Sequence, residues 1–297
     1  MIQLSGLHLL LAYQCTLECD HCFVWGSPWQ RGVMTLEDIG IILAQARELG
    51  AIKTVCFEGG EPFLYYATLL KGVEEVYNSG FATGIVTNAF WAQSEADALA
   101  ALRPFVGLLK SLTLSSDLFH WSALLSQQAH NAQKAAAALG IPTSLISIAR
   151  PDRAADPAAE ALPAPQGGVM YRGRAAKKLA QYAPHHPWAS FTTCPHENLR
   201  APGRAHLDAL GNVHICQGIS LGNIFHKSLS EICASYDPDT HPITAPILRG
   251  GPAELARAYG LEHREEYADA CHLCYESRLL LRVHFPAELL PDQMYGN

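Results

Sequence analysis

Three cysteines within one short loop constrain this chain more than any other feature. Cys15, Cys19 and Cys22 lie in the segment YQCTLECDHCFVWGSP, residues 13–28. With 9 cysteines among 297 residues, chance produces a Cys-x3-Cys-x2-Cys pattern only about 0.008 times per chain. Thiolates this close together suit zinc or an iron–sulfur cluster, because both prefer soft sulfur ligands.

The number of ligands helps to separate the two metals. A closed zinc site needs a fourth ligand, which His21 inside the loop is able to supply. No cysteine or histidine pair follows at the spacing of a zinc finger, so zinc is the less favoured reading. A cubane iron–sulfur cluster held by three cysteines leaves one iron open to a ligand that is not protein. The pattern favours a cluster with such an open position.

The loop resembles the one that marks the radical S-adenosylmethionine (radical SAM) superfamily. In that family the three cysteines follow the first strand of a partial (β/α)6 barrel, with an aromatic residue beside the last cysteine; Phe23 fills that place here. The resemblance implies a 4Fe–4S cluster on Cys15, Cys19 and Cys22, with S-adenosylmethionine on the open iron. It further implies reductive cleavage of that cofactor and removal of a hydrogen atom from a substrate by a 5′-deoxyadenosyl radical.

A second segment carries the same resemblance. VCFEGGEP, residues 55–62, ends in Gly59, Gly60, Glu61 and Pro62, and is similar to the family's Gly-Gly-Glu-Pro segment, which contacts the methionine ammonium of the cofactor. Glycines let main-chain groups approach a ligand closely, and proline suits the first position of a helix. Taken alone, the segment reads as a strand-to-helix turn.

The order of apolar runs predicts an α/β fold. Alternating strands and helices imply a parallel sheet whose strand C-termini meet on one rim. With the resemblance, this predicts a partial (β/α)6 TIM-like barrel. We expect a loop or hinge at 151–170 and a short sixth strand near 168–172. The other strands are expected at about 7–13, 52–57, 81–86, 108–115 and 142–149, and helices at about 35–50, 63–79, 93–103 and 120–139.

Four rim residues are predicted to bind the cofactor by the same resemblance. Thr87 and Asn88 end the third strand, Ser115 ends the fourth and Arg150 ends the fifth. Arginine suits a carboxylate because its guanidinium donates two parallel hydrogen bonds. The alternatives are a turn closed by Asn88 and a solvated charge at Arg150.

Two further rim residues are predicted to act on the substrate. Asp117 and His120 follow the fourth strand, where they would position a substrate or move a proton if they face the cavity. The alternative is that Asp117 and its neighbour Ser116 cap the next helix.

The last third of the chain holds a second group of cysteines, Cys194, Cys216, Cys271 and Cys274. Residues 206–224 read as a hairpin with Gly211 and Asn212 at its turn. These features resemble the SPASM/twitch extension of radical SAM enzymes and imply a second, auxiliary 4Fe–4S cluster, closed by four thiolates and suited to electron transfer. Structural zinc on the same cysteines is the alternative.

The predicted domains are a radical SAM partial barrel, residues 1–184, and a small twitch-like iron–sulfur domain with C-terminal helices, residues 185–297. YRGRAAKK, residues 171–178, resembles a Gly-Arg-Ala segment found at the end of the barrel in relatives with such a domain. Cys56 and Cys233 are expected to be buried packing thiols. The remaining histidines, among them His196, His206, His214 and His272, are too scattered to predict a site.

Net charge and cysteine content limit the classes of partner and the compartment that we expect for this protein. The net charge of −7 predicts no nucleic-acid partner, and the apolar opening run is shorter than the ~20 residues of a membrane span. Nine cysteines without a secretion signal predict reduced thiols and a cytoplasmic protein. The expected partners are a peptide or small-molecule substrate and an external one-electron reductant of the flavodoxin or ferredoxin type. With 14 residues before Cys15, a separate protein is expected to present any peptide that needs a leader-binding domain.

Two other functions remain open from the residues alone. One is an iron–sulfur electron-transfer protein without radical chemistry, against which the segment from Gly59 to Pro62 and the barrel rhythm argue. The other is a binding module stapled by zinc. The favoured prediction is a radical SAM enzyme for oxidative modification or bond formation.

Overall fold

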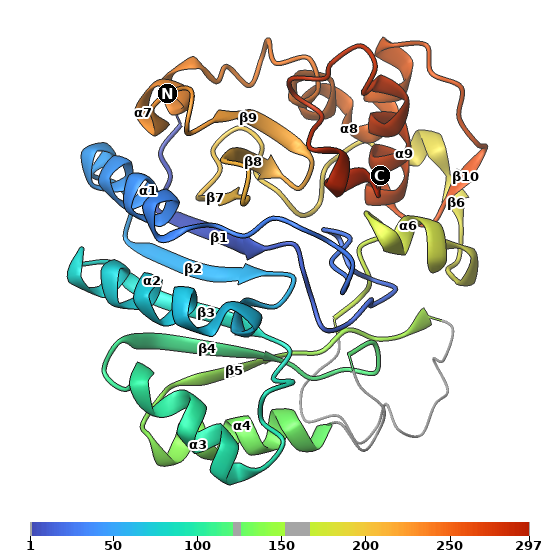
Figure 1. Cartoon of the computed structure of the whole chain (residues 1–297). Helices are drawn as coiled ribbons and strands as arrows, with labels where there is room; N and C mark the ends of the chain where they lie inside the picture. The colour runs from blue at the N-terminus through green and yellow to red at the C-terminus, as the bar shows by residue number, and fades with distance from the viewer. Residues whose placement is uncertain (1, 121–125, 152–166, 297) are drawn as a thin grey trace.

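The computed structural model describes residues 2–120, 126–151 and 167–296. An eight-stranded sheet in the order β5-β4-β3-β2-β1-β7-β8-β9 forms its centre (Figure 1). The six strands from β5 to β7 run parallel, and β8 and β9 continue the sheet antiparallel. The strands are β1 (Gly6–Ala12), β2 (Thr54–Gly59), β3 (Ala82–Thr87), β4 (Leu109–Ser115), β5 (Thr143–Ile146), β7 (Arg204–Leu207), β8 (Asn212–Cys216) and β9 (Ile219–Asn223).

Four amphipathic helices follow the first four strands. Their order confirms the predicted alternation of strands and helices, although residues 121–125 of the predicted fourth helix lie outside the described residues. Thr35 shows why the first helix begins where it does, because it exchanges capping hydrogen bonds with Asp38. The helices are α1 (Leu36–Leu49), α2 (Tyr66–Asn78), α3 (Glu95–Leu102) and α4 (Ser126–Ala138).

The two faces of the sheet differ in chemistry because successive residues of a strand point to opposite sides. Phe57 of β2 is fully buried and packs toward α1 and α2, where a Cβ added at Gly72 would lie 2.9 Å from its ring. The neighbouring positions Cys56 and Glu58 point to the other face, as does His8 of β1, and all three are half-buried. Polar side chains therefore line the face that the helices do not cover.

The sheet is open, and its sixth parallel strand is not the predicted one. Residues 168–172 form no strand, and an isolated bridge between Ile148 and Gly167 is the only pairing there among the described residues. The sixth parallel strand is β7, which pairs with β1 at the opposite side of the sheet. Two adjacent glycines, Gly167 and Gly168, explain the failure, since glycine weakens a strand. Most of the predicted hinge, residues 152–166, lies outside the described residues.

The predicted hairpin is confirmed. β7 and β8 pair antiparallel with Leu207 opposite Val213. Gly211 in the turn has φ +86°, in the left-handed region that favours glycine. Asp208 in the same turn is fully buried and accepts hydrogen bonds from Tyr13 Oη at 2.8 Å and His214 Nε2 at 3.0 Å. Because Tyr13 precedes the cysteine loop, this network ties the loop to the last third of the chain.

The last third of the chain continues the sheet beyond β1 with β7, β8 and β9, and its helices lie around these strands (Figure 1). Its helix α8 is kinked at Gly250 and Gly251, where the backbone leaves the helical region. No helix among the described residues is long and apolar enough to cross a membrane. Its elements are α6 (Arg174–Lys178), α7 (Leu229–Ser235), α8 (Thr244–Ala258), α9 (Ala270–Leu281) and a two-stranded sheet of β6 (His186–Pro187) and β10 (Glu266–Tyr267).

Two glycines at the end of β2, Gly59 and Gly60, let this part of the chain pass directly against the end of β1 and the residues that follow it. A Cβ added at Gly59 would lie 2.4 Å from the carbonyl oxygen of Ala12, and one added at Gly60 would lie 2.1 Å from that of Gln14. The amide nitrogens of Gly60 and Glu61 donate to these same oxygens at 2.7 and 2.9 Å. The close approach of two main chains therefore requires both glycines.

We expect Gly60→Ala to lower the free energy of unfolding by about 1–3 kcal/mol, the usual cost of overpacking. The measurement is urea unfolding of the full chain. Gly40→Ala is the matched control. Gly40 lies inside α1 with nothing within 4 Å of an added Cβ, so this change should stabilise the chain by about 0.5–1 kcal/mol. Equal stability of the two variants would contradict the close-approach explanation.

Candidate functional site

The cysteine loop lies at the rim formed by the C-terminal ends of the parallel strands. Cys15 and Cys19 are buried and Cys22 is half-buried. The loop is held by its own main chain, since Cys15 N donates to Ser27 O at 3.0 Å and Cys22 N donates to Cys19 O at 3.1 Å. The amide of Gly26 donates to Cys22 Sγ at 3.2 Å. An N–H group that donates to sulfur favours the charged thiolate form of the cysteine.

Arg174 from α6 clamps the inner side of the loop. Its buried guanidinium donates to Cys19 O at 2.7 Å and to Gly26 O at 2.9 Å, and its amide donates to Cys22 O at 2.9 Å. Gly173, with φ +59°, lies so close that an added Cβ would be 2.6 Å from Phe23 Cα. The Gly-Arg pair thus gives the YRGRAAKK segment a physical role, which its resemblance alone did not assign to either residue.

Glu61 connects the rim of β2 to the rim of β3. Its side chain is fully buried, and burial raises its pKa to about 7. Oε1 accepts from Thr87 Oγ1 at 2.8 Å and Phe63 N at 3.0 Å, while Oε2 accepts from Asn88 N at 2.8 Å. Pro62 begins the short helix Pro62–Tyr65, as predicted. Both carboxylate oxygens of Glu61 are thus occupied by protein donors.

Asn88 reaches from β3 to the first cysteine. Its Nδ2 lies 3.6 Å from Cys15 Sγ and donates to Thr16 Oγ1 at 3.1 Å, while its Oδ1 accepts from Phe90 N at 3.0 Å. Asn88 therefore closes a turn through its Oδ1 and contacts the cysteine loop through its Nδ2. Its predicted contact with the cofactor stays a prediction.

Asp117 and His120 lie beside the same loop. Asp117 Oδ1 accepts from the amides of Phe119 and His120 at 3.0 and 3.2 Å, as expected of a turn-capping residue. It also pairs with His120 Nδ1 at 2.7 Å. Although burial alone would lower it, nearby Cys19 and the hydrogen bond with Asp117 raise the pKa of His120 to about 10. The capping geometry is present, and the catalytic role stays a prediction.

The remaining predicted cofactor residues are spread along the rim. Ser115 is buried at the end of β4. Arg150 donates to Leu118 O at 3.4 Å, and its guanidinium lies 4.9 Å from the ring centre of Phe119. Phe23 lies under the guanidinium of Arg172 at 5.4 Å. Their predicted contacts with the cofactor stay predictions.

The second group of cysteines converges on one cavity, although its members are far apart in the sequence. Two buried arginines line the same cavity. Arg172 Nη1 donates to Cys216 Sγ at 3.3 Å, and Arg278 Nη1 donates to Gln217 O at 2.7 Å. Buried cations beside thiolates offset their negative charge. The cysteines that line the cavity are Cys194, Cys216, Cys271 and Cys274.

The close groupings of potential ligand atoms bear on the choice between zinc and a cluster. In a tetrahedral zinc site with Zn–S bonds of about 2.3 Å, the sulfurs stand about 3.8 Å apart. Among the described residues, three sets of potential ligand atoms lie within 4.8 Å of one another, and none of them contains two cysteines. His21 belongs to the set with Asp117 and His120, and not to a set with the cysteines. Neither cysteine group as a whole forms one of these close sets among the described residues.

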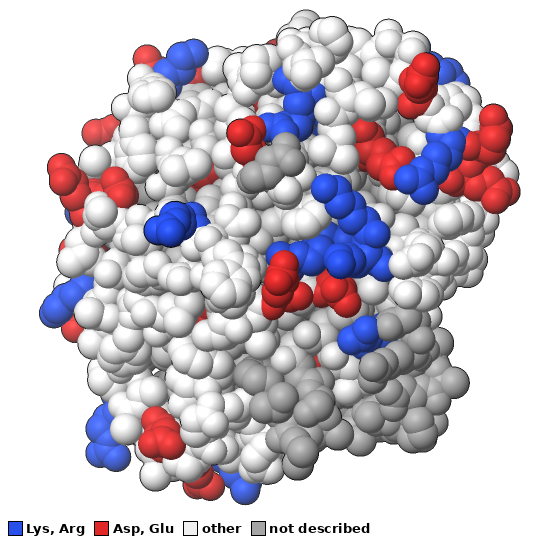
Figure 2. Space-filling model, turned by 45° about the vertical axis from the view of Figure 1, so that its right-hand side comes forward, with Lys and Arg blue, Asp and Glu red and all other residues white. Residues whose placement is uncertain are grey.

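Charges on this side of the molecule are mixed. Figure 2 shows Lys and Arg side chains gathered near the middle of the view, with Asp and Glu side chains directly beside them. Over the part of this face that the structure describes, positive charge does not form a continuous surface.

Comparison with known families finds one match in the N-terminal part of the chain. Residues 9–146 match the sequence model of the Radical SAM superfamily. Over these residues, which make up slightly less than half of the chain, the sequence is therefore similar to the Radical SAM superfamily, and this similarity supports the resemblance.

A curated relative matches a shorter stretch. YydG of Bacillus subtilis (strain 168), whose name assigns it provisionally to peptide biosynthesis, is 28% identical over 108 residues. The match covers 36% of this chain and 34% of YydG. This chain therefore spans about a third of the length of the relative.

Solved structures share the fold. BtrN in complex with AdoMet and 2-DOIA superimposes with a TM-score of 0.50 at 16% identity, over 79% of this chain and 83% of BtrN. Streptococcus suis SuiB bound to precursor peptide SuiA gives a TM-score of 0.48 at 13% identity, over 91% of this chain and 76% of SuiB. The likeness to BtrN and the parallel sheet of this chain together confirm the predicted α/β fold class, with an open sheet.

We expect Arg174→Lys to destabilise the chain by about 1.5–3 kcal/mol, because lysine cannot donate to Cys19 O and Gly26 O at once. The measurement is the urea midpoint of the full chain. Arg204→Lys is the control, since the side chain of Arg204 is 46% exposed and its pair with Glu197 is long, at 3.5 Å; it should change the midpoint little. A midpoint for Arg174→Lys equal to that of the control would rule out the clamp.

Proposed function

We propose that this protein is a radical SAM enzyme that cleaves S-adenosylmethionine reductively and removes a hydrogen atom from a peptide substrate. The observation that carries the proposal is a loop of three cysteines at the rim of a parallel sheet, within residues that match the sequence model of the Radical SAM superfamily.

Cys15, Cys19 and Cys22 would hold the cluster, and their surroundings fit that task. The buried Cys15 thiol has a pKa raised to about 12 by burial, so cluster binding has to displace its proton. Donors from Gly26 and Asn88 then face the sulfurs. When bound, the cluster and S-adenosylmethionine supply the 5′-deoxyadenosyl radical.

The other residues of the rim would bind the cofactor or the substrate. Because both oxygens of Glu61 are occupied, the segment from Gly59 to Pro62 would contact the cofactor through its main chain. Ser115 and Arg150 would bind the cofactor carboxylate. Asp117 and His120 would hold the substrate or transfer a proton beside it, because they lie next to Cys19.

The cavity of four cysteines supports an auxiliary 4Fe–4S cluster in a SPASM/twitch-like domain, residues 185–297. All four thiols line it, and the two buried arginines Arg172 and Arg278 provide compensating charge. Four thiolates close a cluster to outside ligands, which suits electron transfer. Arg172 contacts both Cys216 and Phe23 and so joins the two cysteine groups.

A peptide is the favoured substrate because YydG, to which the radical SAM domain is similar, is named for peptide biosynthesis. An external one-electron reductant of the flavodoxin or ferredoxin type would reduce the cluster, and a separate protein would present the peptide. Mass spectrometry of peptides incubated anaerobically with the reduced enzyme and S-adenosylmethionine tests this choice. Modification of small molecules and never of peptides would contradict it.

We expect Cys22→Ala to abolish formation of 5′-deoxyadenosine, because the first cluster loses a ligand, while Cys274→Ala retains measurable cleavage. The assay uses dithionite as reductant, and iron analysis should fall from about eight to about four per chain in either variant. Cys233→Ala, which removes a fully buried thiol of α7, is the control and should retain both readouts. Loss of all cleavage in Cys274→Ala alone would contradict the division of labour between the two groups.

A further inference from the structure

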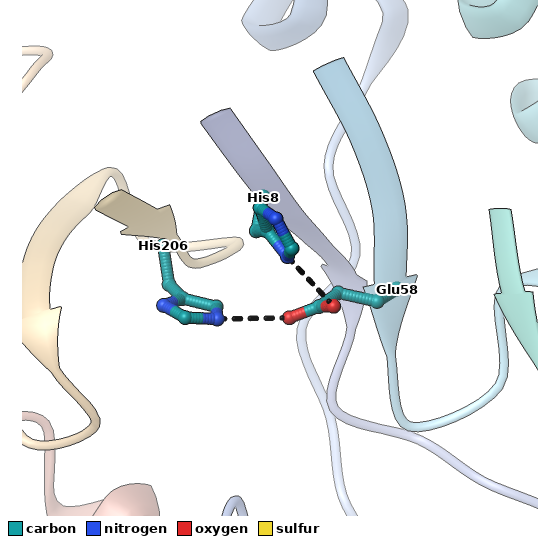
Figure 3. Close-up of side chains that lie close together, drawn as sticks. All are labelled: His8, Glu58 and His206. Carbon is teal, nitrogen blue, oxygen red and sulfur yellow. Dashed lines mark hydrogen bonds and ion pairs between the residues drawn. The ribbon is translucent and has the colours of Figure 1, made fainter. Parts of the chain in front are cut away.

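Three residues with metal-binding side chains meet on the polar face of the sheet, apart from both cysteine groups. They are His8 on β1, Glu58 on β2 and His206 on β7 (Figure 3). His8 and His206 are direct partners in the register of β1 and β7, and Glu58 lies opposite Leu10, two residues further along β1. Diagonal neighbours on one face are within reach of long side chains. The carboxylate therefore lies between the two imidazoles.

We propose that His8, Glu58 and His206 form a binding site for a divalent transition metal, with Zn²⁺ as the ion that best suits two imidazoles and one carboxylate. His8 Nδ1 lies 3.0 Å from Glu58 Oε2, and His206 Nε2 lies 3.2 Å from Glu58 Oε1. One potential ligand atom from each of the three side chains lies within 4.8 Å of those of the other two. In a tetrahedral site with bonds of about 2.0–2.1 Å, ligand atoms stand about 3.4 Å apart. The observed spacing fits one ion.

Hydrogen bonding does not by itself satisfy this cluster. His206 Nε2 faces Glu58 Oε1 and also Gln217 Nε2, the latter at 3.4 Å. If the amide of Gln217 donates to Nε2, this nitrogen carries no proton, and two acceptors, Nε2 and Glu58 Oε1, face each other at 3.2 Å. Glu58 Oε1 and His206 Nδ1 are buried without a well-aligned hydrogen bond, and burial lowers the pKa of His206. A cation between the ring and the carboxylate removes this conflict.

The site is enclosed on one side and open on the other. The side chains of His206 and Glu58 are 6% and 14% exposed, whereas that of His8 is 28% exposed. Three protein ligands on a tetrahedral ion leave one position for an outside ligand, as in catalytic zinc sites. A carbonyl or carboxylate oxygen of a substrate is the ligand that this position would take. Because Glu58 directly precedes Gly59, the site lies just below the rim proposed to bind the cofactor.

The first test identifies the ligands of added zinc in the unaltered protein. The full chain, with its iron–sulfur clusters reconstituted anaerobically, is incubated with Zn²⁺ and dialysed. We expect one retained zinc per chain, with an X-ray absorption spectrum that shows nitrogen and oxygen neighbours at about 2.0–2.1 Å and imidazole scattering. No retained zinc, or zinc with sulfur neighbours at about 2.3 Å alone, overturns the proposal.

The second test assigns the zinc to these residues. We expect Glu58→Gln and His206→Gln each to weaken zinc binding by more than about 100-fold, beyond the 10–100-fold effect of outer-shell residues. His226→Gln removes an exposed histidine and should bind zinc normally. Unchanged binding in Glu58→Gln and His206→Gln overturns the proposal.

Two controls keep the tests independent of folding and of the proposed radical chemistry. Circular dichroism checks that each variant is folded. The X-ray absorption test uses the unaltered chain, so its result does not depend on the folding of any variant. Formation of 5′-deoxyadenosine is measured on the same samples. A chain that forms 5′-deoxyadenosine but binds no zinc through nitrogen and oxygen contradicts the metal site and leaves the radical SAM proposal standing.

Discussion

The main-chain contacts of the cysteine loop are the constraint on which the rest of the site depends. The loop has little secondary structure of its own, and three other segments hold it in place. Gly60 and Glu61 donate to the main chain after β1, Arg174 donates to Cys19 O and Gly26 O, and Asn88 reaches Cys15. A loop fixed from outside can present three sulfurs without a fourth protein ligand, because its shape does not depend on the metal alone.

Segments that are far apart in the sequence meet at this loop. Tyr13 is tied to Asp208 in the hairpin turn, and hydrogen bonds from His214 and Asn212 hold the pKa of that carboxyl below its usual range despite burial. Arg172 lies between Phe23 and Cys216. Changes at the second cysteine group can therefore reach the first through packed, charged side chains. In an enzyme with two clusters, this arrangement would set the protein environment between them.

Local patterns predicted most of the fold. The five strands and four helices of the first half follow from alternating apolar runs, and the spacing of the cysteines indicated a metal centre. Local patterns could not predict that β7, and not residues 168–172, is the sixth parallel strand. β7 joins the sheet only by pairing with β1, between residues about 200 positions apart. For the same reason, local patterns offered no ground for grouping His8 with His206. A shared strand register, and not sequence spacing, brings both histidines to one carboxylate.

The contacts of individual rim residues were harder to predict than the fold, because they depend on tertiary packing. The glycines at 59 and 60 were predicted to make room for a ligand, and the structure shows them making room for the main chain of Ala12 and Gln14. Arg174 stood within a recognised segment, but its buried clamp on the loop depends on tertiary packing.

Electron paramagnetic resonance of the reduced protein tests the central claim most directly. In a Cys274→Ala variant that retains the N-terminal cluster, the account predicts that added S-adenosylmethionine changes the spectrum of that cluster, because an iron without a cysteine ligand binds the cofactor. A reduced cluster whose spectrum is the same with and without S-adenosylmethionine would contradict it.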